Sequence, residues 1–248
     1  MSDVLFLGGN GHAPIRLLPA RDALRRRGEP FTVADLPYPP ATSFDGLLET
    51  LSRQVPERLD RKGVVYASGI GALVVLALRA RGALRDHPVV LQGGVLWGLE
   101  HRWFPRVMRV SPMPRLLAAA FRLGVVRRRF AARHFLREHP RDFVDAFFEG
   151  YRDAGAFAAW FDWLRPGLLR RLEGEIARTP GALDDVVAWW GARDGVVSVE
   201  ELRLTERALG VDVPLRIFPQ WGHYPMIDDP DGWVGEVEGV VATARALS

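Results

Sequence analysis

The sequence predicts an α/β protein: a three-layer sandwich around about six parallel strands, with a helical lid inserted after the fourth strand. Two observations predict this. Short apolar runs alternate with segments of helical period, and the runs are apolar throughout, which is typical of parallel strands buried on both faces. The alternation stops between residues 97 and 179, where only amphipathic helical patterns occur.

Six short apolar runs account for the predicted strands. They are VLFLGG, FTVADL, GVVYAS, PVVLQGG, DVVAWWG and PLRIFPQ. Segments of helical period, such as LLPARDALRRRG, separate most of them, so the crossovers between strands are expected to be right-handed. The expected organisation is a core formed by residues 1–96 and 180–248, with residues 97–179 as the lid.

The composition excludes several kinds of site. The 248 residues include no cysteine, which rules out disulfides, thiolate metal sites and a thiol nucleophile. The glycine-rich stretch GGNGHAPIR has neither the GxGxxG spacing nor the lysine of a phosphate-binding loop. Histidines and carboxylates nowhere show metal-ligand spacing, so the sequence predicts neither a cofactor nor a metal.

Charge and hydropathy bear on partners and location. The net charge is only +3, and the many arginines between 102 and 141 recur at helical spacing around apolar residues. They are interpreted as solvated helix faces, with no nucleic-acid partner. The longest apolar run, GALVVLAL, is too short to span a bilayer, and the start MSDVLFL lacks a basic n-region. A cytoplasmic protein is expected, of undetermined oligomeric state.

Loops whose residues could take part in catalysis follow four of the predicted strands. They are GGNGHAP, ASGIGAL, GARDG and QWGHYPMIDDP. The carboxyl ends of parallel strands meet at one edge of the sheet, where such folds bind ligands. Their order is glycine-rich loop, tight turn, acid and histidine. This pattern resembles the α/β-hydrolase fold superfamily, in which the chain order is nucleophile, acid, histidine.

The resemblance covers nearly the whole chain and implies roles for particular residues. Asp194 in GARDG takes the place of the acid, and His223 in WGHYP takes that of the histidine. Backbone groups at Gly9, Asn10 and Ile70 are expected to stabilise an oxyanion. His12 lies in the same loop as Asn10 and is a further candidate site residue. The family's usual first two strands are expected to be missing, because the chain starts on what would be the third.

The nucleophile position depends on the register of the turn in YASGIGAL. In the family the residues two before and two after the tip are small, because strand and helix crowd each other there. With Ser68 at the tip, those positions would hold a tyrosine and an isoleucine. With Gly69 at the tip they hold Ala67 and Gly71, so this register is favoured. Ser68 then precedes the tip, and glycine adopts the strained backbone at little cost.

Three functions remain open on the sequence. The first is non-covalent base catalysis by His223 and Asp194 (lyase, cyclase or isomerase chemistry, or water activation). The second is a serine esterase or thioesterase using Ser68, His223 and Asp194. The third is a non-catalytic binding protein.

The lid is rich in aromatic residues, which favours a small apolar or aromatic ligand. They are Trp97, Trp103, Phe104, Phe121, Phe135, Phe143, Phe147, Phe148, Tyr151, Phe157, Trp160, Phe161 and Trp163.

Overall fold

The computed structural model describes residues 2–9, 14–38, 43–94 and 102–246. Its centre is one parallel sheet of six strands in the order β2-β1-β3-β4-β5-β6. The strands are β1 (Ser2–Leu7), β2 (Val33–Asp35), β3 (Leu59–Ser68), β4 (Val89–Gln92), β5 (Val186–Gly191) and β6 (Leu215–Phe218). All six predicted runs form strands, so the predicted fold class is confirmed.

The strand order brings the carboxyl ends of β1, β3 and β4 together at one edge of the sheet. The chain begins on β1, forms β2 at the edge, and then crosses back to place β3 on the other side of β1. Leu7 at the end of β1 pairs with Ala67, and Ser68 at the end of β3 pairs with Gln92 at the end of β4. The carboxyl ends of three neighbouring strands are therefore level, at the reversal of strand order where such sheets bind ligands.

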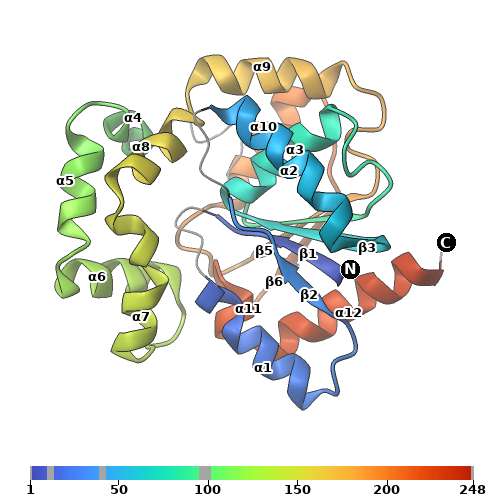
Figure 1. Cartoon of the computed structure of the whole chain (residues 1–248), viewed down its shortest axis with the longest axis horizontal. Helices are drawn as coiled ribbons and strands as arrows, with labels where there is room; N and C mark the ends of the chain where they lie inside the picture. Colours follow the sequence, from blue (N-terminus) through green and yellow to red (C-terminus); the bar gives the residue numbers. More distant parts are fainter. Residues whose placement is uncertain (1, 10–13, 39–42, 95–101, 247–248) are drawn as a thin grey trace.

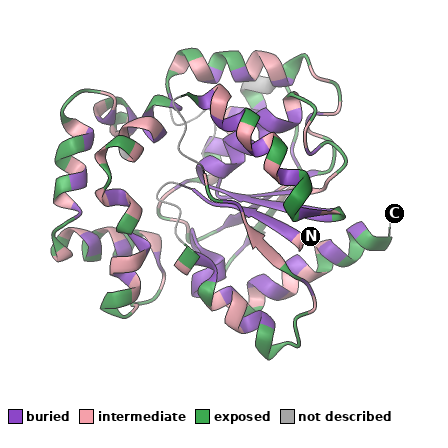
Figure 2. Cartoon of the chain, viewed as in Figure 1, coloured by how far each residue is buried: buried purple, intermediate pink, exposed green. Residues whose placement is uncertain are grey.

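Helices cover both faces of the sheet (Figure 1). On one face lie α1 (Leu18–Arg26) and α12 (Pro230–Ala246), which pack against each other. On the other face lie α2 (Phe44–Arg58), α3 (Ile70–Ala80), α9 (Pro166–Ala177) and α10 (Val199–Leu209). Figure 2 shows most of β1, β3, β4 and β5 buried between these two layers, which is why these strands are apolar on both sides, whereas the edge strands β2 and β6 are only partly buried.

One buried arginine links the loops that precede β4 and β5 at the amino edge of the sheet. Arg79 near the end of α3 is fully buried, and its guanidinium donates to the carbonyl oxygens of Ala182 at 2.8 Å and Leu84 at 2.7 Å. It also donates to the carbonyls of His87 and Asp184. Burial lowers the pKa of Arg79, but these acceptors satisfy the guanidinium where water is excluded.

The chain between β4 and β5 is helical where the structure describes it. After residue 101 it forms α4 (Trp103–Met108), α5 (Met113–Ala120), α6 (Gly124–His134), α7 (Arg141–Phe147), the 3₁₀ turn η3 (Glu149–Arg152) and α8 (Ala154–Asp162) before α9. Figure 1 shows α4 to α8 together beside the core, whereas α9 returns to pack on α3. The exact boundary of the lid stays a prediction.

Within the described residues, no helix is both long and apolar enough to cross a membrane.

Candidate active site

The turn between β3 and α3 has Gly69 at its tip. β3 ends at Ser68, α3 begins at Ile70, and Gly69 between them has φ 56° and ψ −128°. A side chain in this conformation costs about 1–3 kcal/mol, which glycine avoids. The turn therefore presents a residue without a side chain where the resemblance expects a nucleophile.

The neighbours of Gly69 explain why the turn contains so many glycines. A Cβ on Gly71 would lie 2.4 Å from the carbonyl oxygen of Leu7, so only glycine lets α3 pass this close to the end of β1. A Cβ on Gly69 would lie 3.2 Å from Cα of Gly9. The glycine-rich loop after β1 thus rests directly against the tip.

Ser68 is the last residue of β3 and points into the interior. It is only 1% exposed. Among the described residues, its hydroxyl oxygen has no hydrogen-bond partner, and so no hydrogen bond to His223. Of the other expected site residues in this region, Gly9 and Ile70 lie at the turn, while Asn10 and His12 fall outside the described residues.

His223 and Asp194 form a buried hydrogen-bonded pair. Nδ1 of His223 lies 2.8 Å from Oδ2 of Asp194, and the two side chains are 5% and 1% exposed. Because a carboxylate oxygen only accepts, Nδ1 must donate, and Nε2 of the neutral ring is left as the basic nitrogen. The pair has the geometry of an oriented general base.

The loop after β5 holds the carboxylate of Asp194 in place. Oδ1 accepts from the backbone N–H groups of Val196 and Val197 at 2.8 and 2.9 Å. Burial by itself would raise the pKa of Asp194, but the His223 ring and these two N–H groups outweigh it and keep the pKa below its ordinary value. The acid therefore stays ionised beside the imidazole.

Two side chains anchor this loop in turn. Arg102 donates to the carbonyl of Val196 at 2.6 Å, and the indole of Trp190 donates to that of Val197 at 2.9 Å. Arg102 also forms an ion pair with Glu201 on α10. Burial raises the pKa of Glu201 to about 7, although Arg102 opposes the rise. The segment that enters the lid is thereby tied to the acid loop.

Gly93, just after β4, makes room for the pair. It has φ +49°, and a Cβ there would lie 3.0 Å from Oδ2 of Asp194 and 3.1 Å from Nδ1 of His223. The backbone just after β4 therefore packs directly against the hydrogen bond between His223 and Asp194.

Replacing Gly93 with alanine is expected to force the pair apart, because Asp194 is held by two backbone N–H groups and has little room to retreat. The measurement is the low-field imidazole N–H signal of His223 in proton NMR, which should be lost. Gly210→Ala is the matched control: its φ is +66°, and nothing lies within 4 Å of the added Cβ. Both variants carry a backbone cost of roughly 1–2 kcal/mol. An unchanged signal in Gly93→Ala would contradict this role.

His134 brings a second imidazole from the lid to the site. It is the last residue of α6, and its ring centroid lies 6.1 Å from that of His223 and 6.1 Å from that of Tyr224. Its Nδ1 donates to the carbonyl of Phe130 at 2.7 Å. Burial, reinforced by His223, lowers the pKa of His134 to about 3. His134 is therefore neutral, with Nε2 as a hydrogen-bond acceptor.

The segment after His134 docks on the histidine loop. A Cβ on Gly222 would lie 2.8 Å from Cγ of Leu136, so the Leu136 side chain packs directly on the backbone of Gly222. The N–H of Leu136 donates to Asp228 at 3.0 Å, in α11 (Pro225–Asp228). The lid is thus fastened beside His223.

Arg16 adds a permanent positive charge to the region. It lies in the 3₁₀ turn η1 (Pro14–Leu17) and is 1% exposed. Its guanidinium carbon lies 4.5 Å from the ring centroid of Phe147 and 5.6 Å from that of Tyr224. Nη1 donates to the carbonyl of Gly9 at 3.4 Å. The cation therefore lies between the glycine-rich loop, the lid and the histidine loop.

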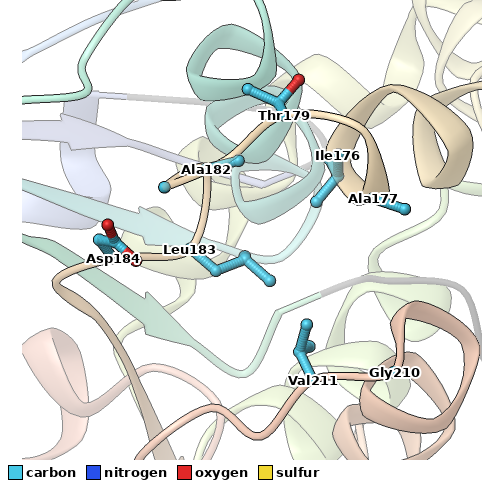
Figure 3. Close-up of a pocket in the computed structure, with 9 residues that line it drawn as sticks. Ile176, Ala177, Thr179, Ala182, Leu183, Asp184, Gly210 and Val211 are labelled. Atoms are coloured by element: carbon cyan, nitrogen blue, oxygen red, sulfur yellow. The ribbon is translucent and has the colours of Figure 1, made fainter.

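A separate hollow lies away from these residues. It has a volume of about 350 Å³. Its lining residues are shown in Figure 3 and are Ile176, Ala177, Thr179, Gly181, Ala182, Leu183, Asp184, Gly210 and Val211. They include the loop that precedes β5, so the hollow lies toward the amino edge of the sheet. None of the predicted site residues lines it.

Sequence comparisons give no family. No protein-family model matches the chain, and no curated protein matches it. Solved structures do match. Haloalkane dehalogenase DbeA from Bradyrhizobium elkani has a TM-score of 0.72 at 16% identity, covering 99% of this chain and 91% of its own. The chain has the α/β-hydrolase fold.

Two further α/β-hydrolase-fold structures cover the chain as fully. The 2-hydroxy-6-oxo-6-phenylhexa-2,4-dienoate hydrolase from Rhodococcus has a TM-score of 0.65 at 18% identity, over 96% of this chain and 90% of its own. A carboxylesterase structure from Nitrososphaera gargenis has a TM-score of 0.60 at 13% identity, over 99% and 91%. At these identities the likeness shows the fold, not the reaction.

From the sequence, Asp194 and His223 were expected to pair and Gly69 was favoured at the tip, and the structure shows that hydrogen bond and that turn, whereas the sequence did not point to Gly93, Arg16 or His134. For Gly93, the signal was a glycine pair directly after a strand. For the other two there was none, because an arginine or histidine within a helical pattern is usually solvated. No group of three or more carboxylates and histidines that could hold a metal occurs among the described residues.

Proposed function

We propose that the chain is an enzyme in which His223, oriented by Asp194, acts as a general base on a small apolar or aromatic substrate. The reaction proceeds without a covalent serine intermediate. The single observation that carries this proposal is the buried His223–Asp194 hydrogen bond of 2.8 Å, in a chain whose turn after β3 has Gly69, with φ 56°, at its tip. A binding protein would have no need of an oriented base.

In the proposed reaction, Nε2 of His223 takes a proton from a carbon acid of the substrate or from a water molecule. The imidazolium that forms is stabilised by the ionised carboxylate of Asp194, which already accepts from Nδ1. When a C–H bond breaks, its electron pair moves to a carbonyl oxygen as an enolate or expels a leaving group. When an O–H bond of water breaks, the pair stays on the water oxygen, which forms a C–O bond to the substrate carbonyl carbon while the C=O π pair moves to the carbonyl oxygen. Proton abstraction, elimination, ring closure and hydrolysis all begin with this step.

A developing oxyanion has donors at the turn. The N–H of Ile70 is the first of α3, an 11-residue helix, and N–H groups at a helix start are unpaired within the helix and carry its positive dipole end. Gly9 lies against it, with its Cβ position 3.7 Å from the nitrogen of Ile70. The positive charge of Arg16 beside Gly9 favours the same anion.

Two observations argue against Ser68 as the nucleophile. Its side chain is 1% exposed, and it belongs to the paired part of β3 opposite Gln92. To attack a substrate it would have to leave the strand and replace Gly69 at the tip. Burial and strand pairing of Ser68 therefore disfavour the serine-esterase alternative.

The aromatic surroundings of His223 support an apolar or aromatic substrate. The ring of Tyr224 lies 4.6 Å from that of His223, and the ring of Phe147 on the lid lies 5.1 Å from Tyr224. One of the similar structures is named for the hydrolysis of a phenyl-substituted dienoate, which is consistent with this substrate class on this fold.

The test uses two aromatic probes and one covalent reagent. Ring opening of 5-nitrobenzisoxazole reports carbon deprotonation by a base, and p-nitrophenyl acetate reports ester hydrolysis. We expect the protein to open the benzisoxazole faster than free imidazole at equal concentration, and Ser68→Ala to retain that rate within about twofold, since Ser68 takes no part. Intact-mass analysis after treatment with a fluorophosphonate should show no adduct.

Two outcomes would contradict the proposal. A stoichiometric adduct on Ser68, with loss of ester hydrolysis in Ser68→Ala, would establish the serine esterase. Binding of the benzisoxazole with no ring opening above that of free imidazole would favour a non-catalytic binding protein.

A further inference from the structure

The outer part of the lid combines a high density of arginines with exposed large apolar side chains. Between residues 102 and 137 there is no aspartate or glutamate. The same stretch contains ten arginines: Arg102, Arg106, Arg109, Arg115, Arg122, Arg127, Arg128, Arg129, Arg133 and Arg137. Over the whole chain, 33 basic residues are nearly balanced by 30 acidic ones. The positive charge is therefore concentrated on the lid.

The same stretch also carries most of the exposed large apolar side chains. Seven are found among the described residues, and five of them lie here: Trp103, Val110, Leu116, Leu123 and Val125, each 56–71% exposed. Trp103 is the most exposed of all at 71%. Leaving large apolar groups in water has a free-energy cost, so a group of them marks a surface that meets something less polar.

The exposed arginines and the exposed apolar residues occur on the same lid helices. In α6, Val125, Arg128, Arg129 and Arg133 are exposed, whereas Arg127 faces inward and pairs with Asp145. In α5, Arg115 and Leu116 are neighbours and both exposed. Figure 1 shows α5 and α6 at the end of the molecule farthest from the sheet. We call the exposed arginines and apolar residues of 103–133 the basic lid face.

We propose that the basic lid face binds an anionic membrane surface, with the lid helices lying in the interface. Arginine guanidiniums pair with phosphate and carboxylate headgroups, while Trp103 and the exposed Leu and Val side chains enter the acyl boundary. Cationic helical segments that also expose apolar side chains and a tryptophan have the composition of interfacial anchors. The sequence interpretation of these arginines as solvated helix faces does not account for the apolar residues beside them.

The other occupants fit less well. A nucleic acid would use the arginines, but it offers nothing to exposed Leu and Val side chains. A second copy of the chain meeting the same face would bring two sets of arginines together without any carboxylate from 102–137 to offset them. Charge complementarity therefore favours an anionic lipid surface.

The test is cosedimentation of the full chain with vesicles. We expect binding to vesicles of phosphatidylcholine and phosphatidylserine, little binding to phosphatidylcholine alone, and weaker binding as salt rises. The double variant Arg128→Gln, Arg129→Gln should bind about twentyfold more weakly, since each arginine near an anionic surface contributes about fivefold. Trp103→Ser should weaken binding at high salt as well as at low salt.

The matched control is the double variant Arg25→Gln, Arg26→Gln on α1. It removes the same charge from exposed arginines away from the lid, and it should bind vesicles as the parent does. Circular dichroism of each variant checks that the lid helices are intact.

Three results would overturn the proposal. The first is equal binding to neutral and anionic vesicles. The second is a loss of vesicle affinity in the α1 control variant as large as in the lid variant. The third is no vesicle binding at all. In the last case, salt-sensitive binding of a single-stranded oligonucleotide would establish a nucleic-acid surface instead. The proposal does not rest on the function of His223, and the vesicle result is independent of the benzisoxazole assay.

Discussion

Replacing His223 with alanine is expected to lower the rate of 5-nitrobenzisoxazole opening by about 10²- to 10⁴-fold, the usual contribution of a positioned base. Nε2 of this residue is the basic nitrogen of the buried pair, because Nδ1 donates to Asp194 at 2.8 Å. The measurement is the initial rate of product absorbance at saturating probe. A fall in the rate constant rather than in probe affinity would identify the loss as one of chemistry.

Asp194→Asn should give a related loss for a different reason. The amide keeps the size of the carboxylate but cannot stabilise an imidazolium, and its NH₂ group can leave Nδ1 as the acceptor, which is the wrong tautomer. His87→Gln is the control for removing a histidine, because His87 contacts the carbonyl of Gly63 near the amino end of β4. If His223→Ala turned over the probe as fast as His87→Gln, base catalysis would be excluded.

Gly69→Ser is expected to convert the site into one that a fluorophosphonate labels. The backbone of Gly69 at φ 56° and ψ −128° already has the strained form of a nucleophile turn. The serine hydroxyl would then occupy the position that the α/β-hydrolase fold gives to its nucleophile, opposite the histidine. We expect a stoichiometric adduct by intact mass, and its loss when His223→Ala is added.

Gly69→Ser should also lower the free energy of unfolding by about 1–3 kcal/mol, because the backbone conformation at position 69 is strained for any residue other than glycine. The new Cβ also lies 3.2 Å from Cα of Gly9, which must shift by a few tenths of an ångström. Gly69→Ala is the matched control: it carries the same backbone and steric cost without a hydroxyl. It should be equally destabilised in urea and unlabelled. A folded, unlabelled Gly69→Ser protein would show that position 69 does not face His223.

Much of the fold could be predicted because its signals are local. A strand buried on both faces is apolar at every position, and GVVYAS or DVVAWWG shows this without knowledge of its neighbours. The turn register could be predicted for a similar reason. Gly71 must be small because a Cβ would meet the carbonyl oxygen of Leu7 at 2.4 Å, and this crowding follows from the angle between β3 and α3. Asp194 and His223 were found because each follows a predicted strand.

The rest of the site depends on residues that are distant in sequence. Gly93 at the end of β4 and His134 at the end of α6 lie beside the His223–Asp194 pair, and Arg102 at the entry to the lid holds the acid loop through the carbonyl of Val196. The periodicity of a sequence does not predict such contacts, because they depend on how one helix or strand packs against another. An arginine or histidine within a helical pattern gives the same sequence signal whether it is solvated or buried beside the His223–Asp194 pair.

The sequence alone determined the parallel sheet and the interrupting helical block, and it favoured Gly69 over Ser68 at the tip of the turn, because burial and steric crowding impose those residue types locally. Only the tertiary structure decided that Ser68 is enclosed in β3, that a hydrogen bond joins His223 to Asp194, and that Arg16 lies beside the glycine-rich loop. The physical reason is that orientation and burial of a polar side chain are set by the elements packed around it.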